Sequence, residues 1–405
     1  MYNDIKDIKA QDNEYTMHTY KKFDVAFKSG YSATLCDVEN KTYIDFGSGI
    51  GTNALGYGNK EWINAVTEQA KNIAHSSNLY YNPIMSDLAE SLCKVTGMSK
   101  VFYGNSGAEA NECAIKLARK YSFMKYSAEK ERNKIITLKN SFHGRTVTTI
   151  SATGQDVFHN YFFPFTEGFI FADADIESIK ALTDDKVCAF MIELIQGEGG
   201  VIPVKKSFVA ELAAFAAEKD ILIIVDEVQT GVSRTGSFLA SEQFEITPDI
   251  VTLAKGLGGG LPIGACLCNE KLKDTFVYSD HGSTFGGNMV VTAGASVVVK
   301  KVSDKIFCEE VLRKGEYLKS KLIEALGDCI IEIRGMGLML GVELKSGLNV
   351  REIAEKALEF GVVVLTAKTA LRFLPPLIIS YAEIDKGVAG LTEAINIISN
   401  KKGDS

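Results

Sequence analysis

Two charged residues, an aspartate and a lysine, each follow an apolar run in the middle of the chain. Asp226 comes after the run from Ile221 to Val225, and Lys255 comes after the run from Ile250 to Ala254. The first run is apolar at every position, which is typical of a parallel strand that helices cover on both faces, and the second follows the turn signal Thr247-Pro248-Asp249. Ligands bind outside the carboxyl ends of such strands. We therefore expect the carboxylate and the amine to converge on one ligand.

A structural ion pair is the alternative interpretation of these two charges, since charged residues are common at strand ends. The segment Gly256–Gly260, with four glycines, favours a ligand, because glycine lets the backbone approach a bulky group or adopt positive φ. Pyridoxal phosphate uses both residue types: its aldehyde binds a lysine amine, and an aspartate keeps its pyridine nitrogen protonated. The sequence therefore indicates Lys255 and Asp226 as the catalytic pair of a pyridoxal phosphate site.

Three segments of the chain resemble those of a known family. They read DEVQTGVSRTG from Asp226, TPDIVTLAKGLGGGLPIGA from Thr247 and HGSTFGGN from His281. In these segments the chain resembles the class III, fold type I aminotransferases, and within that family it looks most like the acetylornithine aminotransferases. The resemblance runs from about Phe23 to the C-terminus.

The resemblance implies an α/β fold, the pyridoxal-phosphate-dependent transferase fold type I. Its large domain, expected at residues 76–305, has a mostly parallel seven-stranded sheet between helices. Residues 1–75 are expected to supply an N-terminal segment with the substrate loop, and residues 306–405 a smaller α+β domain. The change of pattern after Cys329, where IIEIRGMGLMLGVEL begins, also favours a separate layer there.

A phosphate site is predicted where a short strand, Val101 to Tyr103, turns into a helix. Ser106, Gly107 and Ala108 stand at the start of that helix, where free backbone amides and the positive end of the dipole suit an anion. An ordinary serine cap is the alternative, because serine caps helices of every kind. Together with the aspartate and lysine, the anion site is the preferred interpretation.

An aromatic residue and an arginine follow the predicted strand Lys134 to Leu138. In isolation Phe142 would be a core residue and Arg145 a solvated one. A ring at Phe142 could lie on a flat cofactor, and the guanidinium of Arg145 could hold a carboxylate through two hydrogen bonds. The resemblance implies both roles: Phe142 stacks on the pyridine ring, and Arg145 binds the α-carboxylate of the amino acid.

A glutamate and an arginine far apart in the chain form a second expected pair. Arg372 lies in the apolar run LRFLPPL, where an unpaired charge is expensive to bury. Glu198 lies between glycines, after the predicted strand Val187 to Leu194, where a glutamate is most often only solvated. The resemblance implies that Glu198 covers the charge of Arg372 for one substrate and swings away for a dicarboxylate.

The glycine-rich loop Ser279 to Asn288 brings two hydroxyls that could donate to a phosphate, Ser283 and Thr284. The resemblance places Ser283 at the substrate. It places Thr284 at the cofactor phosphate of the neighbouring subunit, so a homodimer with active sites at its interface is implied. It also adds Val228 and Gln229, which follow Asp226, to the cofactor-binding residues.

The composition is that of an ordinary globular protein and narrows the list of partners. Of the 405 residues 46% are hydrophobic and 23% charged, and the net charge of −7 disfavours nucleic acid and anionic membranes as partners. No apolar run approaches the roughly 18 residues of a membrane helix, and the N-terminus has no apolar targeting segment. The eight cysteines and five histidines show no metal-site spacing. We expect a cytoplasmic protein without a metal.

The expected reaction is a ping-pong transamination. It moves the terminal amino group of N-acetylornithine to 2-oxoglutarate, giving N-acetylglutamate semialdehyde and glutamate, as in arginine biosynthesis. Ornithine, succinylornithine, 4-aminobutyrate or a carrier-linked lysine are alternative donors, because the cofactor core is common to all of them. An aminomutase and a non-catalytic regulator of the same fold are the alternatives of other classes.

Overall fold

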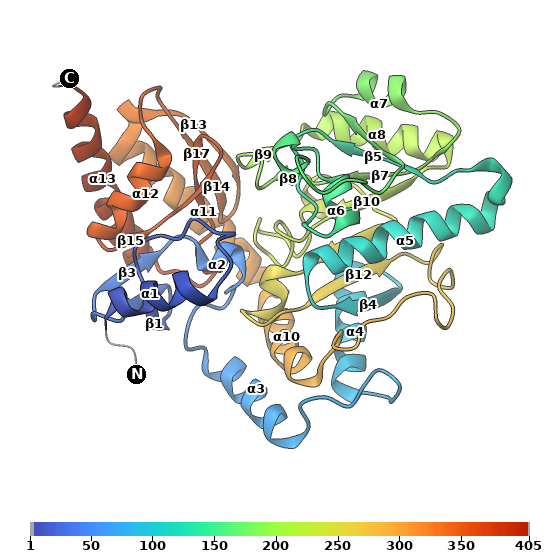
Figure 1. Ribbon diagram of the computed structural model, residues 1–405, viewed down its shortest axis with the longest axis horizontal. Helices are drawn as coiled ribbons and strands as arrows, with labels where there is room; N and C mark the ends of the chain where they lie inside the picture. The colour runs from blue at the N-terminus through green and yellow to red at the C-terminus, as the bar shows by residue number, and fades with distance from the viewer. Residues whose placement is uncertain (1–3, 404–405) are drawn as a thin grey trace.

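A seven-stranded sheet is the centre of the larger part of the molecule (Figure 1). The computed structural model describes residues 4–403, with side chains as far as residue 400. The strand order is β4 (Lys100–Gly104), β12 (Gly264–Cys268), β11 (Ile250–Leu253), β10 (Leu222–Asp226), β7 (Val187–Ile192), β5 (Lys134–Leu138) and β6 (Phe169–Ala172). Strand β12 is antiparallel to both neighbours, and the remaining pairs are parallel. The expected mostly parallel sheet is confirmed.

Helices cover both faces of this sheet, because successive residues of its strands are apolar on opposite sides. On one face, Met191 and Ile224 belong to a core formed with α5 (Gly107–Tyr126). On the other face, Ile223 and Val225 pack in a core with α8 (Lys206–Lys219). Two smaller helices of this part are α6 (Val147–Ala152) and α7 (Ile176–Leu182). The continuous apolar runs of the sequence are thus explained by burial on both faces.

The parallel strands end at one edge of the sheet, and their register brings the expected residues there. Asp226 pairs with Thr252, three residues before Lys255. Val225 pairs with Ile192, which directly precedes Glu193. Two carboxylates and the lysine therefore come from neighbouring strands at the same edge.

The smaller part joins both ends of the chain, drawn in blue and red in Figure 1. One sheet has the order β1 (Phe27–Tyr31), β2 (Thr34–Asp37), β3 (Thr42–Asp45), β15 (Val362–Val363). A second sheet has the order β13 (Ile330–Met336), β14 (Met339–Leu344), β17 (Ala370–Phe373), β16 (Leu365–Ala367). Helices α11 (Lys305–Leu326), α12 (Val350–Glu359) and α13 (Tyr381–Gly403) pack beside them.

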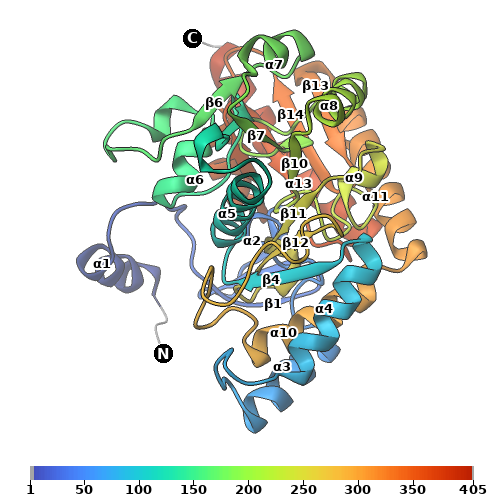
Figure 2. The ribbon, with the colours of Figure 1, turned by 90° about the vertical axis from the view of Figure 1, so that its right-hand side faces the viewer.

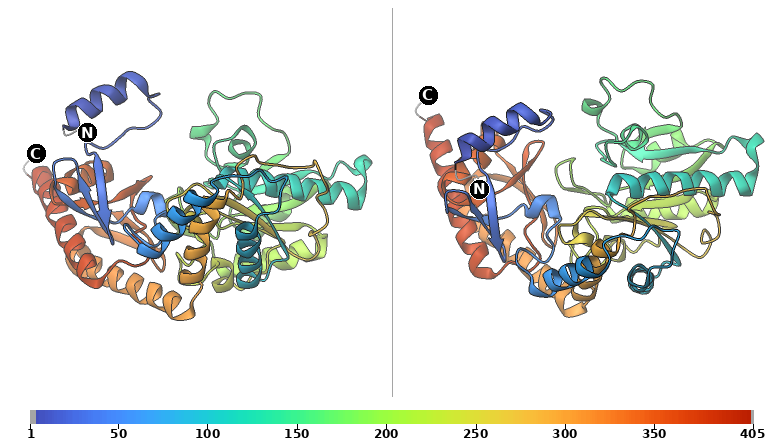
Figure 3. Two further views of the ribbon diagram at one scale, coloured as in Figure 1. Left: turned by 90° about the horizontal axis from the view of Figure 1, so that it is seen from below. Right: turned by 60° about the horizontal axis from the view of Figure 1, so that its bottom comes forward.

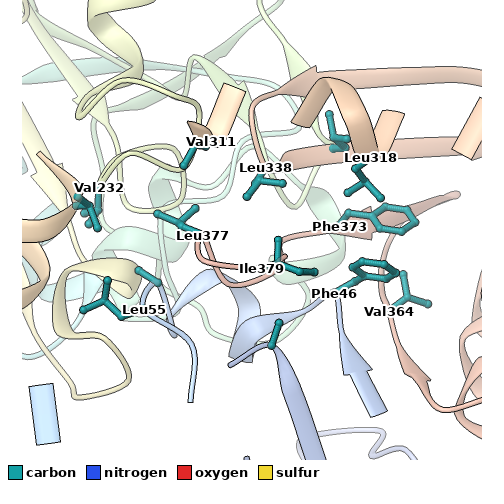
Figure 4. Close-up of a cluster of buried hydrophobic side chains, with 14 of the residues drawn as sticks. Phe46, Leu55, Val232, Val311, Leu318, Leu338, Val364, Phe373, Leu377 and Ile379 are labelled. Atoms are coloured by element: carbon teal, nitrogen blue, oxygen red, sulfur yellow. The ribbon is translucent and has the colours of Figure 1, made fainter. Parts of the chain in front are cut away.

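A single apolar cluster connects the two ends of the chain. Figure 4 shows Phe46 from the N-terminal segment beside Phe373 and Ile379 from the C-terminal segment. The rings of Phe46 and Phe373 lie 5.3 Å apart, and both side chains are fully buried. Val232 extends the same cluster towards the large sheet. The small part is therefore one packed unit although its residues come from both termini.

The remaining elements are peripheral helices and short strands. They are α1 (Ile5–Tyr15), α2 (Ser48–Gly51), α3 (Lys60–Asn72), α4 (Pro83–Thr96), α9 (Ala240–Gln243), α10 (Met289–Val302), β8 (Ile195–Gln196) and β9 (Ile202–Pro203). Helix α10 packs against α3 and α4, whereas α1 buries no residue and stands off the body of the molecule (Figures 2 and 3). Among residues 4–403, no helix is long and apolar enough to cross a membrane.

The local structure departs from the sequence-based expectations at two places. The apolar run Val362 to Leu365 predicts one strand, but it is divided, because its first half pairs with β3 and its second half begins β16. The polar N-terminal segment, for which no element was predicted, forms α1, where Asp4 accepts a hydrogen bond from the Lys6 N–H at 2.8 Å. The alternating residues from Ala33 to Phe46 predict a hairpin, and β2 and β3 confirm it.

Candidate active site

A cavity of 460 Å³ lies at the carboxyl edge of the large sheet. Nine of the residues singled out in the sequence line it: Ser106, Gly107, Ala108, Phe142, Arg145, Asp226, Val228, Gln229 and Lys255. Four others do not: Glu198, Ser283, Thr284 and Arg372. The volume is in the range of sites that enclose a small cofactor.

The carboxylate of Asp226 is held by three donors. Its Oδ2 accepts from Asn111 Nδ2 at 2.8 Å and lies 2.8 Å from His143 Nδ1, and its Oδ1 accepts from the Val228 N–H at 3.0 Å. Asn111 is itself fixed, since its Oδ1 accepts from the hydroxyl of Thr252 at 2.7 Å. Contacts from three different segments therefore fix the position of the Asp226 carboxylate at the cavity wall.

Lys255 stands at the start of a short 3₁₀ turn, Lys255–Gly258, with a positive φ of 40°. Backbone strain in a residue other than glycine is typical of functional sites. Burial lowers the pKa of the Lys255 amine from its usual value, because the charged form is poorly solvated there. The charge of Glu198 opposes this shift, and that of Arg372 adds to it. A larger share of this amine is consequently neutral and able to act as a base.

The start of α5 forms a cradle of backbone amides. Ser106 caps the helix, with its Oγ accepting from the Glu109 N–H at 3.1 Å. A Cβ at Gly107 would stand 2.7 Å from Val228 Cγ1, and one at Gly264 would stand 2.0 Å from the Ser106 carbonyl oxygen. Only glycine fits at these positions, so the cradle packs directly against its neighbours. Free amides at a helix start bind anions.

Phe142 and Arg145 also line the cavity. Phe142 is half-buried, and Arg145 lies at the exposed rim. The Arg145 guanidinium stands 5.7 Å from the centre of the Phe142 ring and 4.2 Å from that of Phe158. An arginine stacked on aromatic rings at the rim is placed to meet a carboxylate that enters from solvent.

Glu198 and Arg372 form an ion pair next to the cavity. Arg372 Nη1 donates to Glu198 Oε1 at 2.5 Å and to Gln229 Oε1 at 3.4 Å, which connects the pair to the cavity wall. Burial alone would raise the pKa of the Glu198 carboxyl, but the charges of Arg372 and Lys255 outweigh it and lower that pKa. The Nε of Arg372 is buried without a hydrogen-bond partner among the described residues. The expected partnership of these two residues is present in the structure.

Ser283 and Thr284 lie outside the cavity of their own chain. The Oγ of Ser283 accepts from Asn105 Nδ2 at 3.1 Å, one residue before the cradle. Thr284 is exposed. Its expected place at a neighbouring subunit's cofactor therefore stays a prediction.

Two segments close to the loops of the site have clear local contacts. Tyr57, in the Tyr57-Gly58-Asn59-Lys60 segment, donates its hydroxyl to Asp45 at 2.6 Å, and Asn59 caps α3. In the turn between β16 and β17, Lys368 donates to Asn140 Oδ1 at 2.6 Å. Hydrogen bonds thus fix both segments.

Comparison with known families decides the identity. Residues 15–395 match the family model described as aminotransferase class III. The chain belongs to the class III aminotransferases. Similar curated members include acetylornithine aminotransferases of Haemophilus ducreyi, 46% identical over 96% of this chain and 98% of that protein, and of Aquifex aeolicus, 45% identical over 94% and 100%.

Solved structures of class III aminotransferases have the same fold. The ornithine aminotransferase of Toxoplasma gondii matches with a TM-score of 0.94 at 31% identity, over 98% of this chain and 96% of that one. The N-acetylornithine aminotransferase of Stenotrophomonas maltophilia matches with a TM-score of 0.83 at 32% identity, over 97% and 99%. A further Toxoplasma gondii structure is described with pyridoxal phosphate at its active site. The chain is a pyridoxal-phosphate-dependent aminotransferase of fold type I.

The residues of this aminotransferase's cavity fit that cofactor. The carboxylate of Asp226, the amine of Lys255 and the amide cradle at the start of α5 surround one space. These are the groups that the ring nitrogen, the aldehyde and the phosphate of the cofactor need, in that order. The Nε2 of His143 is buried and has no hydrogen-bond partner among the described residues. Because His143 also lines the cavity, this nitrogen is a further polar atom of the site.

Sequence reasoning missed three residues of this aminotransferase site, Asn111, His143 and Glu193. Glu193 had the same signal as Asp226, a charge directly after a buried strand. His143 lies within the segment that identified Phe142 and Arg145. Asn111 gave no signal, because its contact with Asp226 depends on how α5 packs across the sheet.

Proposed function

We propose that this enzyme transfers the terminal amino group of N-acetylornithine to 2-oxoglutarate, the step expected in arginine biosynthesis. The observation that carries the proposal is the Arg372–Glu198 pair at 2.5 Å beside the cavity of Lys255 and Asp226. When the pair is closed, Glu198 neutralises Arg372, and when it is open, Arg372 is free to bind a carboxylate. One site can thus accept two substrates of different charge. Full-length identity of 38–46% with acetylornithine aminotransferases supports this donor.

Lys255 is the proposed acid and base of the reaction. Its Nζ would take a proton from the substrate carbon that bears the amino group and return a proton to the cofactor side. Burial lowers the pKa of this amine, so the neutral form needed for proton removal is more accessible near neutral pH. Bound pyridoxal phosphate supplies an electron sink for the negative charge that develops at that carbon.

Asp226 is proposed to keep the ring nitrogen protonated, and the surrounding side chains to fix the ring. The two oxygens of Asp226 accept hydrogen bonds from Asn111 and from the Val228 N–H, which hold the carboxylate in one orientation. Phe142 and Val228 would contact the two faces of the ring, with Gln229 at its edge. The amides from Ser106 to Ala108 would hold the phosphate.

The two substrates differ in charge where Arg372 lies. With N-acetylornithine, Glu198 would stay on Arg372 and neutralise it. With glutamate or 2-oxoglutarate, Glu198 would move away, and Arg372 would bind the second carboxylate. Arg145 at the rim would bind the α-carboxylate of either substrate, with Ser283 near by.

We also propose a cytoplasmic homodimer in which Thr284 reaches the partner's cofactor phosphate. The segments around Tyr81 and from Tyr278 to Phe285 lie together, since Asn78 Nδ2 donates to the Ser283 carbonyl at 3.0 Å. Large apolar side chains gather on both segments. Tyr81 and Tyr278 on these segments are fully exposed, and Phe285 is 59% exposed. A second copy of this chain would cover them. A large domain at residues 76–305 with a small domain from both ends stays part of the proposal.

An absorbance titration of the purified holoenzyme tests the proposed reaction. Adding N-acetylornithine without a keto acid should shift the visible cofactor band, and adding 2-oxoglutarate should restore it. Succinylornithine, 4-aminobutyrate and an acylated lysine in the same assay compare the donors. If N-acetylornithine leaves the spectrum unchanged while another amine shifts it, that other amine is the donor.

Ornithine is the second candidate donor. The observation that favours it is the TM-score of 0.94 with an ornithine aminotransferase, above the 0.83 with the N-acetylornithine aminotransferase. The sequence identities of these two structures, 31% and 32%, do not separate the donors. The ratio of kcat/KM for N-acetylornithine to that for ornithine should exceed one if the first proposal is right.

A further inference from the structure

One buried carboxyl of the cavity has no part in the mechanism above. Glu193 directly follows β7, lines the cavity and is 5% exposed. It comes from the strand next to that of Asp226, at the same edge of the sheet. A buried carboxyl needs hydrogen-bond partners to compensate for lost water. Its partners therefore show what this side chain holds in place.

The two oxygens of Glu193 hold two different segments of the site. Oε2 accepts from the Phe142 N–H at 2.8 Å, and Oε1 accepts from the Gly197 N–H at 3.4 Å. Phe142 carries the ring that lines the cavity, and Gly197 directly precedes Glu198. One carboxylate thus connects the ring segment with the base of the loop that carries Glu198.

The base of that loop is fixed on its other sides as well. The Gly197 carbonyl accepts from Arg372 Nη1 at 3.4 Å, and a Cβ at Gly197 would stand 2.3 Å from Gln229 Oε1. The Gly200 carbonyl, three residues later, accepts from Arg334 Nε at 2.8 Å. The swing of Glu198 in the proposed function therefore takes place between two fixed points, and Glu193 holds the first of them.

We propose that Glu193 is a positioning residue that holds the Phe142 and Gly197 segments together and thereby favours the Glu198–Arg372 pair. This inference rests on the proposed function, in which the amine donor needs that pair and the dicarboxylate needs it open. Losing the anchor therefore weakens the donor half-reaction more than the glutamate half-reaction. The residue acts through Glu198 and Phe142 and takes no proton from the substrate.

The anchor is also sensitive to pH. Burial raises the pKa of the Glu193 carboxyl to about 7; the charges of His143 and Lys255 oppose this, and that of Asp226 adds to it. These three groups, from the loop after β5, the turn after β11 and the end of β10, are the charges that face it. Below that pH the carboxyl is protonated, and one of its oxygens changes from a hydrogen-bond acceptor to a hydrogen-bond donor. The preference of the enzyme for N-acetylornithine over glutamate should therefore weaken as the pH falls through about 7.

Half-reaction kinetics of the holoenzyme test the anchor with two glutamine variants. Glu193→Gln should lower the ratio of kcat/KM for N-acetylornithine to that for glutamate about tenfold, the effect of one hydrogen bond to a charged group. The ratio in this variant should also lose its change between about pH 6 and pH 8. Glu227→Gln is the matched control, because Glu227 is fully buried and accepts from the Ser241 N–H at 2.8 Å outside the cavity. It should leave the ratio as in the wild type.

Equal losses in both half-reactions of Glu193→Gln, or an unchanged ratio, would overturn the anchor. If Glu193→Gln does not fold, Glu193→Asp keeps the charge and the acid titration, and its ratio should still depend on pH. A wild-type enzyme that shows neither half-reaction would instead refute the proposed function, so the two failures are distinguishable.

Discussion

Asp226 shows how a single side chain is prepared for its role by neighbours from other elements. Asn111 comes from α5, His143 from the loop after β5, and Val228 from the chain just beyond β10. Each contributes one contact to the carboxylate, so its position and its direction are both fixed.

Asp226→Ala should abolish most of the activity even if some cofactor stays bound. Removing one partner of a buried charge pair costs about 3–5 kcal/mol, which corresponds to a loss of at least about 100-fold in kcat. Steady-state kinetics with cofactor content measured by absorbance would check this. Asp249→Ala is the control: Asp249 accepts from the Ile223 N–H at 2.9 Å, at the far end of the strands, so only stability should fall. Near wild-type turnover of Asp226→Ala would refute the assignment.

At the scale of elements, the start of α5 depends on a close approach that only glycine permits. Gly107→Ala would place a Cβ 2.7 Å from Val228 Cγ1, so the helix start or Val228 must shift. Overpacking of this kind costs about 1–3 kcal/mol, and we expect about tenfold weaker cofactor binding. Cofactor titration of the apoenzyme measures the effect. Gly327→Ala, at the end of α11 where a Cβ meets nothing within 4 Å, should bind as the wild type does.

The loop that carries Glu198 should separate the two half-reactions. Glu198→Ala leaves the buried charge of Arg372 uncovered, so the donor without a second carboxylate should bind worse. Glutamate brings its own carboxylate and should react nearly as before. Single-turnover kinetics of each half-reaction measure the two effects, and equal losses would argue against a switch.

The sequence was most informative about elements with strong local signals. The continuous apolar runs before Asp226 and Lys255 identify two central strands, and the serine and glycine at 106 and 107 identify the start of α5. Strands β6 and β12 were not predicted; β6 pairs with β5, more than thirty residues earlier, and the outer partner of β12 is β4, more than 150 residues earlier. The division at Val364 likewise depends on two sheets competing for one segment.

The site residues were likewise predictable where a local signal was present. Residues at strand ends could be predicted to meet because parallel strands end at one edge of the sheet. The contacts of Glu193 with Phe142 and Gly197 could not, since they require knowing which strands are neighbours. The apolar run around Arg372 indicated that this charge needs a partner, and the family resemblance supported Glu198 in that place.

At the scale of the molecule, the site depends on how its two parts meet. Arg234 is buried, and its Nη1 donates to the carbonyls of Leu338 at 2.9 Å and Pro375 at 2.5 Å in the C-terminal part. Lys368 bonds to Asn140 across the same boundary. These contacts bring β17, and with it Arg372, to the edge of the large sheet. A substrate that reaches both Arg145 and Arg372 therefore contacts both parts.

The proposed dimer should dissociate when a charge is placed on its exposed aromatic segments. Tyr81→Asp and Tyr278→Asp introduce a charge that would be buried without a partner in the dimer. Analytical ultracentrifugation should show a larger monomer fraction and absorbance a lower cofactor content. Ile323→Asp, at a 51% exposed position of α11, is the control and should sediment as the wild type does. Wild-type assembly of both tyrosine variants would contradict this interface.

The central claim is that Lys255 and Asp226 hold one pyridoxal phosphate between them. Borohydride reduction of the holoenzyme, followed by peptide mass mapping, tests it most directly, because reduction fixes the cofactor on the amine that binds it. The account predicts one modified lysine, Lys255, in the wild type. Modification of a different lysine as the main product, or none at Lys255, would contradict it.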